Sequence, residues 1–526
     1  MNQINPLMPT GNNSKGDSLR KRYFYKFFSN ILGFPINLVM QSIITRGLGP
    51  QNYGDFNFLS NFFNEVIGFF NMGTSIGFYT KLSQRPKESK LVLFYFYFMG
   101  VVMLLVAAFV IVSHSTGLYT KLWPVQKLSV IYLALCLGIF TWLVNILSQM
   151  TDAYGVTVVA EISKMSQKIL GLIIIAILFV YQKLNLINFF FYNYFMLFLL
   201  ILLFLKIMKH SILPISQTCI LKFKEIKEYT KEFYKYSHPL FLYGLVGMFV
   251  NIFDIWLLQF FGGSIQQGFF GLSYQISTIC ILFTSAMTPL ILREFSIAHN
   301  NKDLNLISNI FRTHMPLLYS ITAFIACFIA VNADRVVLIM GGGKFSGATL
   351  AVIIMAFYPL HQTYGQLSGS VFYATDQTRL YRNIGVVFML FGLPVTYLLI
   401  APKNLFGMSL GANGLAIKAV FLQFISVNVM FYFISKFLKL SFWKYCVHQI
   451  LCVGCLLTLS IFANYIVNSL LGLHTNIIVG FLTTGFLYSL MVGCFILFFP
   501  PVFGIEKTKV SKILTYGFKM RHKLNR

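Results

Sequence analysis

Charge, and negative charge above all, is scarce in this chain. Only 11% of its 526 residues are charged, and 15 Asp and Glu stand against 41 Lys and Arg, which gives a formal net charge of +26. Soluble globular domains are about half apolar and about a quarter charged, whereas this chain is 57% hydrophobic. The composition excludes an ordinary soluble domain. It predicts an all-α polytopic membrane protein, because apolar runs of about 20 residues recur along the chain.

The groupings that cofactor chemistry needs are also missing from the sequence. Eight Cys are scattered, mostly in apolar runs, so we expect no disulfide framework. No His, Cys and Asp residues have the spacing of a metal site. Gly343-Lys344-Phe345 lacks the Ser or Thr of a phosphate-binding loop. We therefore expect no metal, no cofactor, no ATP hydrolysis and no catalytic residues. We also expect no nucleic-acid partner, because the positive-inside distribution of Lys and Arg accounts for most of the net charge.

Fourteen segments are long and apolar enough to be transmembrane helices. They lie near 23–46, 54–79, 91–113, 127–149, 162–181, 186–207, 239–261, 268–292, 313–332, 347–371, 383–401, 411–433, 446–467 and 474–499.

These segments suggest a division of the chain into lobes. We expect a disordered cytoplasmic tail over 1–20, an N-lobe of six helices over 21–207, and an amphipathic cytoplasmic linker over 208–238. A C-lobe of six helices follows over 239–433, then helices thirteen and fourteen over 434–500 and a basic tail over 501–526. The first apolar run has no evident small-residue cleavage site, so we expect it to be a retained helix.

An internal repeat supports two lobes. When the chain is shifted by 214 residues without gaps, helix one falls on helix seven and the loops that follow them also coincide. Because both helices start on the same side, such a repeat is parallel and has its axis along the membrane normal. It predicts two six-helix lobes around a central cavity. The matching pairs are Gly33 with Gly247, Asn37 with Asn251, Gly49 with Gly263, Gly54 with Gly268 and Phe56 with Phe270.

Polar side chains follow one face of the first two predicted helices. Residues spaced by four lie on one helical face, and amides are costly in hydrocarbon, so they should face protein or a water-filled cavity. This pattern indicates a hydrophilic path, typical of a transporter of something polar. The members are Gly33, Asn37, Gln41 and Thr45 in helix one, and Asn57, Asn61, Asn64, Asn71 and Ser75 in helix two.

Four charged residues are candidates for function within the predicted spans or at their ends. Arg46, at the outer end of helix one, matches phosphate oxygens with its planar fork of donors, or it anchors at the interface. Lys418 is a candidate anion ligand, and Glu65 and Asp254 are candidates for proton or cation coupling. The alternative is a structural ion pair between Lys418 and a carboxylate. Asn251 and Asp254 continue a face of helix seven that mirrors the one on helix one.

Three short motifs resemble those of bacterial polysaccharide-biosynthesis flippases of the Wzx type. They are Arg46-Gly47-Leu48-Gly49-Pro50-Gln51-Asn52-Tyr53-Gly54, which resembles an R-x-LGP-x-x-YG opening, Leu338-Ile339-Met340-Gly341-Gly342-Gly343-Lys344-Phe345, and Gly411-Ala412-Asn413-Gly414-Leu415-Ala416.

That family belongs to the multidrug/oligosaccharidyl-lipid/polysaccharide exporter (MOP) superfamily. The resemblance implies a flippase for an undecaprenyl-pyrophosphate-linked oligosaccharide in O-antigen, capsule or exopolysaccharide synthesis. It implies a lipid-linked oligosaccharide and membrane lipid as partners, together with polymerase and chain-length proteins of the pathway, and a place in the bacterial cytoplasmic membrane. Arg46, Lys418, Asn37, Gln41, Asn61, Asn64 and Asn251 are then the candidate substrate-binding residues.

Other functions stay open on the sequence. A multidrug or cation antiporter of the same superfamily should favour acidic over basic cavity residues. A membrane-embedded oligosaccharide polymerase or ligase usually needs a large outer loop with catalytic Arg or His, and the outer connections here are short. A purely structural or scramblase role is the remaining alternative.

The distribution of Lys and Arg predicts the orientation. With the N-terminus inside, 33 of the 41 Lys and Arg lie in segments expected to be cytoplasmic and 8 lie at or toward the outer side. We therefore expect both termini and the linker to be cytoplasmic. Reporter fusions after residues 235 and 526 should give a cytoplasmic signal. A periplasmic signal at either position contradicts the fourteen-helix topology.

Overall fold

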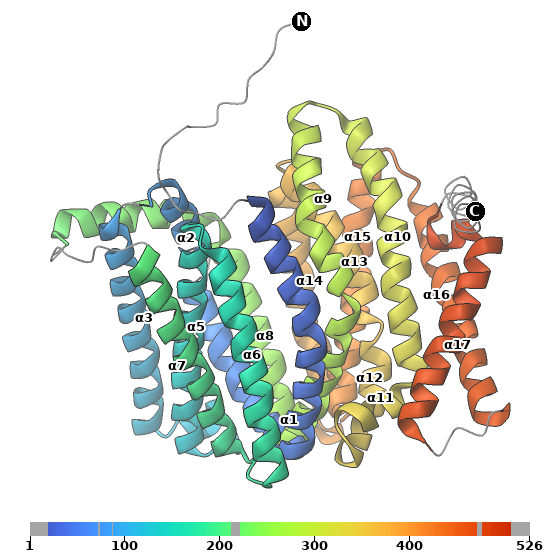
Figure 1. Ribbon diagram of the computed structural model, residues 1–526, viewed down its shortest axis with the longest axis horizontal. Coiled ribbons are helices and arrows are strands. Elements are labelled where there is room, and N and C mark those ends of the chain that lie inside the picture. Colours follow the sequence, from blue (N-terminus) through green and yellow to red (C-terminus); the bar gives the residue numbers. More distant parts are fainter. Residues whose placement is uncertain (1–18, 72–73, 87, 212–220, 471–475, 506–526) are drawn as a thin grey trace, which may run out of the picture. The chain divides into compact units, whose positions relative to one another are not determined.

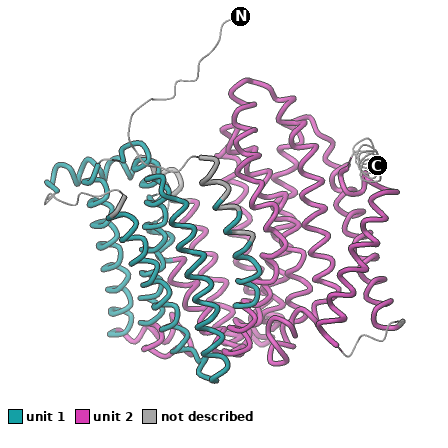
Figure 2. The backbone as a smooth tube through the Cα atoms, in the orientation of Figure 1, with its two compact units in different colours: residues 1–40, 66–115, 132–241 teal, residues 41–65, 116–131, 242–526 magenta. Residues whose placement is uncertain are grey.

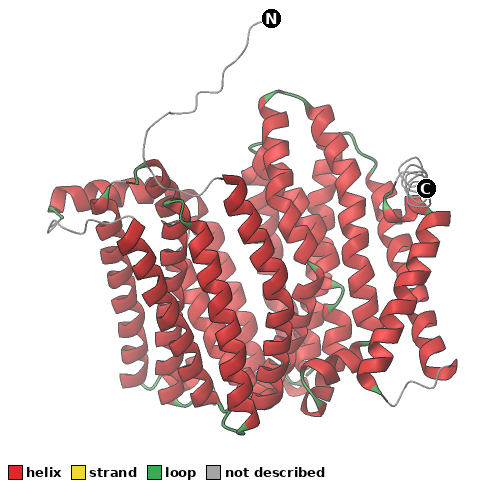
Figure 3. Cartoon of the chain, viewed as in Figure 1, coloured by secondary structure: helices red, strands yellow, loops and turns green. Residues whose placement is uncertain are grey.

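The computed structural model describes residues 19–71, 74–86, 88–211, 221–470 and 476–505. Within these ranges the chain forms helices and turns and contains no strand (Figure 3). The protein is an all-α polytopic membrane protein, as the composition predicts. The expected tails, 1–20 and 501–526, lie mostly outside the described residues, as does much of the first half of the linker.

Seventeen α-helices are described, and Figure 1 labels most of them. Their bounds are α1 Leu19–Phe70, α2 Thr74–Gln84, α3 Ser89–Ser115, α4 Tyr119–Leu122, α5 Leu128–Ala153, α6 Thr157–Val180, α7 Leu186–Ser211, α8 Phe223–Cys280, α9 Leu282–Asn300, α10 Leu304–Val331, α11 Ala333–Met340, α12 Thr349–Met355, α13 Tyr358–Ala374, α14 Thr378–Ile400, α15 Gly411–Phe437, α16 Phe442–Tyr465 and α17 Ile477–Phe498. Short 3₁₀ or π turns occupy Gly343–Ala348 (η1), Lys403–Leu405 (η2), Ile466–Leu470 (η3) and Pro500–Phe503 (η4).

The number of spans differs from the predicted fourteen. Among the described residues, ten helices are long and apolar enough to cross a membrane, or eleven if the bent pair of Gly343–Met355 and Tyr358–Ala374 forms one span. Helical segments nevertheless occupy the described parts of all fourteen predicted ranges. The number of spans is lower than predicted for two reasons. Helix α8 holds two predicted segments but counts as one span. Helix α1 holds two more, and it is not counted because amide and charged side chains interrupt its apolar runs.

Helices α1 and α8 each break at one glycine. Gly49 has φ 70° and ψ 172°, and Gly263, 214 residues later, has φ 71° and ψ −177°. A positive φ with extended ψ is a conformation essentially restricted to glycine. Two equivalent positions therefore share one rare backbone conformation, which is what an internal structural repeat requires.

The segments after these two breaks contact each other reciprocally. A Cβ on Gly54 would lie 1.7 Å from the carbonyl oxygen of Ser264, and a Cβ on Gly268 would lie 2.1 Å from that of Pro50. The offset of 214 residues exchanges the members of these two contacts, as an isologous two-fold interface does. A Cβ on Gly271 would meet Asn57, its own equivalent, at 2.9 Å. This pair lies where a pseudo-two-fold axis would pass.

Clustering of contacts divides the chain into two compact units (Figure 2). Unit 1 comprises residues 1–40, 66–115 and 132–241, and unit 2 comprises 41–65, 116–131 and 242–526. Unit 2 thus includes short stretches of the expected N-lobe together with the expected C-lobe. The two-lobe division at 21–207 and 239–433 stays a prediction.

In unit 1 the second half of the expected linker forms the start of α8 and packs against α2 and α3. Phe233 lies 5.5 Å from the ring of Phe94. Glu232 pairs with Lys81 and, at 2.9 Å, with Arg85, and Glu225 pairs with Lys90 at 2.5 Å. The hydrogen bond from Lys90 is the main cause that lowers the pKa of Glu225. The Glu and aromatic side chains of this amphipathic segment therefore hold it to unit 1.

In unit 2 small residues let helices approach closely. Ala351 and Met355 of α12 pack against Ala412 and Ala416 of α15, and all four are buried. Small side chains at such contacts are typical of helix packing in membranes, where backbone proximity replaces the hydrophobic effect as the source of stability. This packing fixes α15, which carries Lys418.

The reciprocal glycine contact predicts sensitivity to a single methyl group. Gly54→Ala and Gly268→Ala should each destabilise the protein by about 1–3 kcal/mol, because the added Cβ would overlap backbone atoms that cannot move aside as a side chain can. Thermal unfolding of the purified protein in detergent measures this change. Gly247→Ala is the control, because a Cβ there meets nothing within 4 Å. Equal unfolding temperatures for all three variants would contradict the contact.

Candidate functional site

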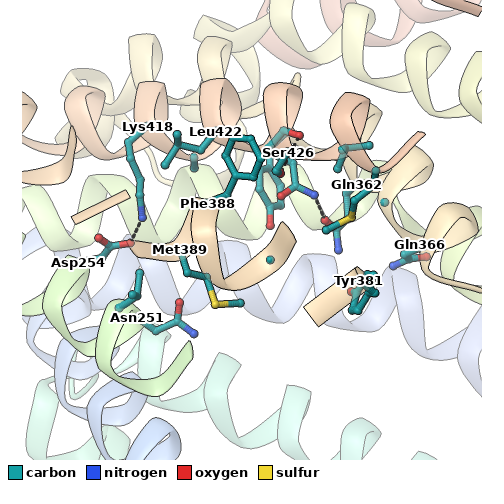
Figure 4. Close-up of a pocket in the computed structure, with 18 of the residues that line it drawn as sticks. Asn251, Asp254, Gln362, Gln366, Tyr381, Phe388, Met389, Lys418, Leu422 and Ser426 are labelled. Carbon is teal, nitrogen blue, oxygen red and sulfur yellow. Dashed lines mark hydrogen bonds and ion pairs between the residues drawn. The ribbon is translucent and has the colours of Figure 1, made fainter. Parts of the chain in front are cut away.

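Helices α8, α13, α14 and α15 line a cavity of about 490 Å³ (Figure 4). From here on we call it the central cavity; all its lining residues belong to unit 2, so the cavity expected between the two lobes stays a prediction. Its volume falls in the range of small-molecule binding sites. Its wall combines amides, hydroxyls, aromatic rings and one ion pair. The polar and aromatic members are Tyr243, Asn251, Asp254, Tyr358, Gln362, Gln366, Tyr381, Phe388, Lys418, Gln423 and Ser426.

An ion pair lies at one end of the central cavity. The ammonium of Lys418 on α15 donates to Oδ2 of Asp254 on α8, and the hydroxyl of Thr396 on α14 donates to Oδ1 of Asp254 at 2.7 Å. The side chains of Lys418 and Asp254 are only 10% and 13% exposed. Each charge thus has its countercharge beside it, and the pair as a whole is neutral.

Glutamines line another part of the cavity and are held by hydrogen bonds. Gln423 on α15 donates to the side-chain oxygen of Gln362 on α13. One turn further along α13, Gln366 accepts from Thr288 at 3.0 Å and donates to Ser285 at 3.3 Å. Amides both donate and accept, so this wall suits a ligand rich in hydroxyl groups.

Aromatic rings form the face of the cavity near Tyr381. The rings of Tyr243 and Tyr381 have centroids 6.2 Å apart. A Cβ on Gly385 would lie 2.9 Å from the ring of Tyr243, so glycine at this position of α14 makes room for that ring. Rigid aromatic faces beside amides give a surface that can hold both the faces and the edges of a sugar ring.

Three of the nine site residues predicted from the sequence line the central cavity: Asn251, Asp254 and Lys418. Glu65 is next to it, because its Oε1 accepts a hydrogen bond from Nδ2 of Asn251 at 3.2 Å. Asn251 therefore connects Glu65 with the wall that carries Asp254. In this structure the ion-pair alternative describes Lys418, and Asp254, not Glu65, is its partner.

The remaining predicted residues lie elsewhere. Gln41 donates to the hydroxyl of Tyr53 at 2.7 Å, inside unit 2. Asn61 and Asn64 are exposed in unit 2, and Asn37 is exposed in unit 1. Whether these four share a path with the central cavity stays a prediction.

Arg46 ties the broken region of α1 to the end of α11. Its Nη2 donates to the carbonyl oxygens of Leu338 and Ile339 at 2.7 and 2.8 Å, and its Nε donates to Ile339 at 3.1 Å. Thr45 donates to the next carbonyl, that of Met340. Arg46 also lines an open depression of about 460 Å³ with Asn476, Ile477 and Ile478. It joins two of the three motifs found in the sequence.

The sequence analysis did not find Gln362, Gln366, Gln423 and Ser426. Gln362 and Gln366 are four residues apart on α13, the same spacing that marks the polar face of helix one. Gln423 and Ser426 are three residues apart on α15, so a criterion that admits spacings of three and four would have found all of them. Across the described ranges, no three His, Cys, Asp or Glu side chains are grouped as a metal site requires.

The arrangement of helices is similar to that of several solved membrane transporters. An inward-facing multidrug resistance MATE transporter of the MOP superfamily matches with a TM-score of 0.62 at 12% identity, over 77% of this chain and 94% of its own. The lipid II flippase MurJ in an inward closed conformation matches with a TM-score of 0.60 at 16% identity, over 90% and 98%. A MOP superfamily transporter from Pyrococcus furiosus matches with a TM-score of 0.53 at 13% identity, over 82% and 99%.

The fold is that of the MOP transporters. No protein-family model and no curated protein matches the chain in sequence, so the likeness concerns the fold alone. It confirms the all-α membrane fold expected from the sequence and agrees with the superfamily that the three motifs resemble.

The buried pair predicts a particular pattern of stability. Lys418→Met should destabilise the protein by about 3–5 kcal/mol, because it leaves the carboxylate of Asp254 buried without a countercharge. The double variant Lys418→Met with Asp254→Asn should recover most of this loss, because no charge then remains. A double-mutant cycle of unfolding free energies measures the coupling. Additive losses in the cycle would show that the two side chains do not depend on each other.

Proposed function

We propose that this protein is a flippase for an undecaprenyl-pyrophosphate-linked oligosaccharide in the bacterial cytoplasmic membrane. The oligosaccharide head crosses through the polar interior while the lipid tail stays in the bilayer. The transport cycle is alternating access, in which the two lobes rock against each other. The product serves surface polysaccharide synthesis as O-antigen, capsule or exopolysaccharide, with polymerase and chain-length proteins as partners.

The central cavity carries this proposal. Its wall offers paired amides, hydroxyls and tyrosine rings and a neutralised ion pair. Neutral sugars present many hydroxyl groups, so they match a wall of neutral donors and acceptors. The fold, shared with a lipid II flippase and with a MATE transporter, supports a transport function but not a particular substrate.

Arg46 is the candidate contact for the pyrophosphate. Two of its nitrogens hold the carbonyls of Leu338 and Ile339, and its Nη1 makes no hydrogen bond among the described residues. Asn37, Gln41, Asn61 and Asn64 extend the proposed polar path. In the proposed orientation both termini are cytoplasmic, and the reciprocal contact after Gly49 and Gly263 closes the outer side.

A multidrug or cation antiporter is the second candidate, and one observation favours it. Glu65 is a carboxylate beside the cavity whose described partner, Asn251, is neutral. Against it, Asp254 already has a cation in Lys418, so the carboxylate inside the cavity has no need of an external cation.

The paired glutamines give the test. Gln362→Leu with Gln423→Leu removes both partners of one hydrogen bond, so neither amide is left unsatisfied and the fold should keep its stability. Translocation of a fluorescent lipid-linked oligosaccharide in proteoliposomes should fall about tenfold, because hydrogen bonds to the sugars are lost.

The matched control is Gln449→Leu, which removes a buried amide on α16 that bonds Asn428 outside the cavity. Its translocation rate should equal that of the wild type. Unchanged oligosaccharide translocation in the double variant, together with drug or cation exchange that depends on Glu65, would favour the antiporter.

A further inference from the structure

A second cavity, of about 600 Å³, lies in unit 2 at the upper ends of α10 and α16 in Figure 1. It shares no residue with the central cavity. We call it the basic cavity, because three of its lining residues are Lys or Arg and none is Asp or Glu. The lining residues are Arg312, Pro316, Lys439, Leu440, Ser441, Lys444, Tyr445, His448, Pro501, Gly504 and Ile505.

The three cations of the basic cavity have no countercharge in the described part of the protein. No hydrogen bond or ion pair is formed by the side chains of Arg312, Lys439 or Lys444 with any described residue. All three residues are exposed, as are other lysines without a described ion pair such as Lys302 and Lys403, so their grouping around one cavity is what distinguishes them. Three like charges on one cavity repel each other, so an anion placed among them would be stabilised by all three.

Lys439 adopts a backbone conformation that normally requires glycine. Its φ is 52°, and it follows the last residues of α15 in the arrangement in which the amide of Leu440 bonds back to the carbonyl of Ser435 at 2.7 Å. This C-terminal position is usually occupied by glycine, because other residues lose about 1–2 kcal/mol in the left-handed region. A lysine here costs stability and places an ammonium on the cavity wall.

The cavity also has a fixed wall. Tyr445 is 7% exposed, and its ring lies 5.1 Å from Phe431 and 6.2 Å from Phe311. Gly504 packs so tightly on α10 that a Cβ would lie 2.3 Å from that of Pro316. Both ring nitrogens of His448 are shielded from solvent, and the backbone of Val502 is the polar group beside them. The cations and His448 therefore line one cavity, and the packing of Tyr445 and Gly504 fixes the shape of its wall.

We propose that the basic cavity binds a phosphate group. The guanidinium of Arg312 can hold two phosphate oxygens at once, and Lys439 and Lys444 act as compact positive charges beside it. Leu440, Pro501 and Ile505 give the cavity an apolar side, which suits a phosphate carried by a lipid. In the proposed orientation this end is cytoplasmic, so the lipid belongs to the cytoplasmic leaflet. The inference holds whatever substrate the central cavity carries.

Purified full-length protein in neutral detergent provides the test. Its thermal unfolding is followed against increasing phosphatidylglycerol, against phosphatidylcholine with the same acyl chains, and against inorganic phosphate at matched ionic strength. A ligand that binds only the folded protein raises the unfolding temperature in proportion to its affinity. We expect phosphatidylglycerol to stabilise the wild type more than phosphatidylcholine does.

Three variants separate binding from folding. Arg312→Gln with Lys444→Gln should weaken the response to phosphatidylglycerol at least about tenfold in apparent affinity. Lys439→Gly should weaken it too, while the lipid-free protein unfolds at the same or a higher temperature, because glycine suits the left-handed backbone. Lys436→Gln is the control: Lys436 lies at the same end of α15, but its ammonium is 4.5 Å from the ring of Tyr432 and does not line the cavity.

The outcomes decide both the site and the source of the phosphate. Loss of the phosphatidylglycerol response in the cavity variants but not in Lys436→Gln supports a lipid phosphate. The same pattern with inorganic phosphate alone supports a soluble phosphate anion as the ligand. Cavity variants that respond like the wild type to all three additives overturn the proposal.

Discussion

An unpaired charge inside an apolar helix bundle costs several kcal/mol, and the described interior of this protein is arranged around that constraint. Lys418 and Asp254 neutralise each other, and Thr396 satisfies a second carboxylate oxygen. Arg335 is buried without a carboxylate and is surrounded instead by side-chain oxygens, among them those of Asn468 and, at 3.0 Å, Thr484. The Lys418–Asp254 pair with Thr396 joins α8, α14 and α15. The hydrogen bonds of Arg335 join α11, α16 and α17. These polar groups therefore also specify how the helices pack.

The backbone obeys a related constraint, because its polar groups must find partners where water is scarce. Helices α1 and α8 therefore break only at Gly49 and Gly263, and the carbonyls at the end of α11 are bonded by Arg46 and Thr45. The two breaks let Gly54 and Gly268 cross at backbone contact. The first glycine motif, which looks like a loop signature in the sequence, forms in the structure an interface with its equivalent segment around Gly268. The side chain at its start, Arg46, donates hydrogen bonds to a different element, the end of α11.

The sequence predicted the class, the helical segments and the repeat, because hydropathy and glycine spacing are local and periodic signals. It offered an ion pair between Lys418 and a carboxylate as an alternative, because ionisable side chains within apolar spans need partners. It did not predict that Asp254, and not Glu65, is the partner of Lys418, because that choice depends on helix rotation and on Thr396 of a third helix. It missed Gln362 and Gln423 although polar spacing on their helices was a usable signal; only their pairing, which joins α13 and α15, depends on the tertiary structure. Three of the nine predicted site residues line the central cavity, whereas Asn61 and Asn64 of helix two are exposed.

The neutral pair has a consequence for the energetics of the proposed transport. A pyrophosphate head carries negative charge out of a cell whose interior is negative, and moving one elementary charge across the membrane potential is worth roughly 2.3 kcal/mol per 100 mV. If positive charge of the cavity moved outward together with the head, the electrical free energy gained by exporting the negative head would be cancelled. Because Lys418 and Asp254 sum to zero and stay with the protein, the head's own charge determines the electrical work. On the proposed function, the membrane potential then drives export without an ion that must be exchanged, and the basic residues are needed at the ends of the path, where the phosphate enters and leaves, rather than in its middle.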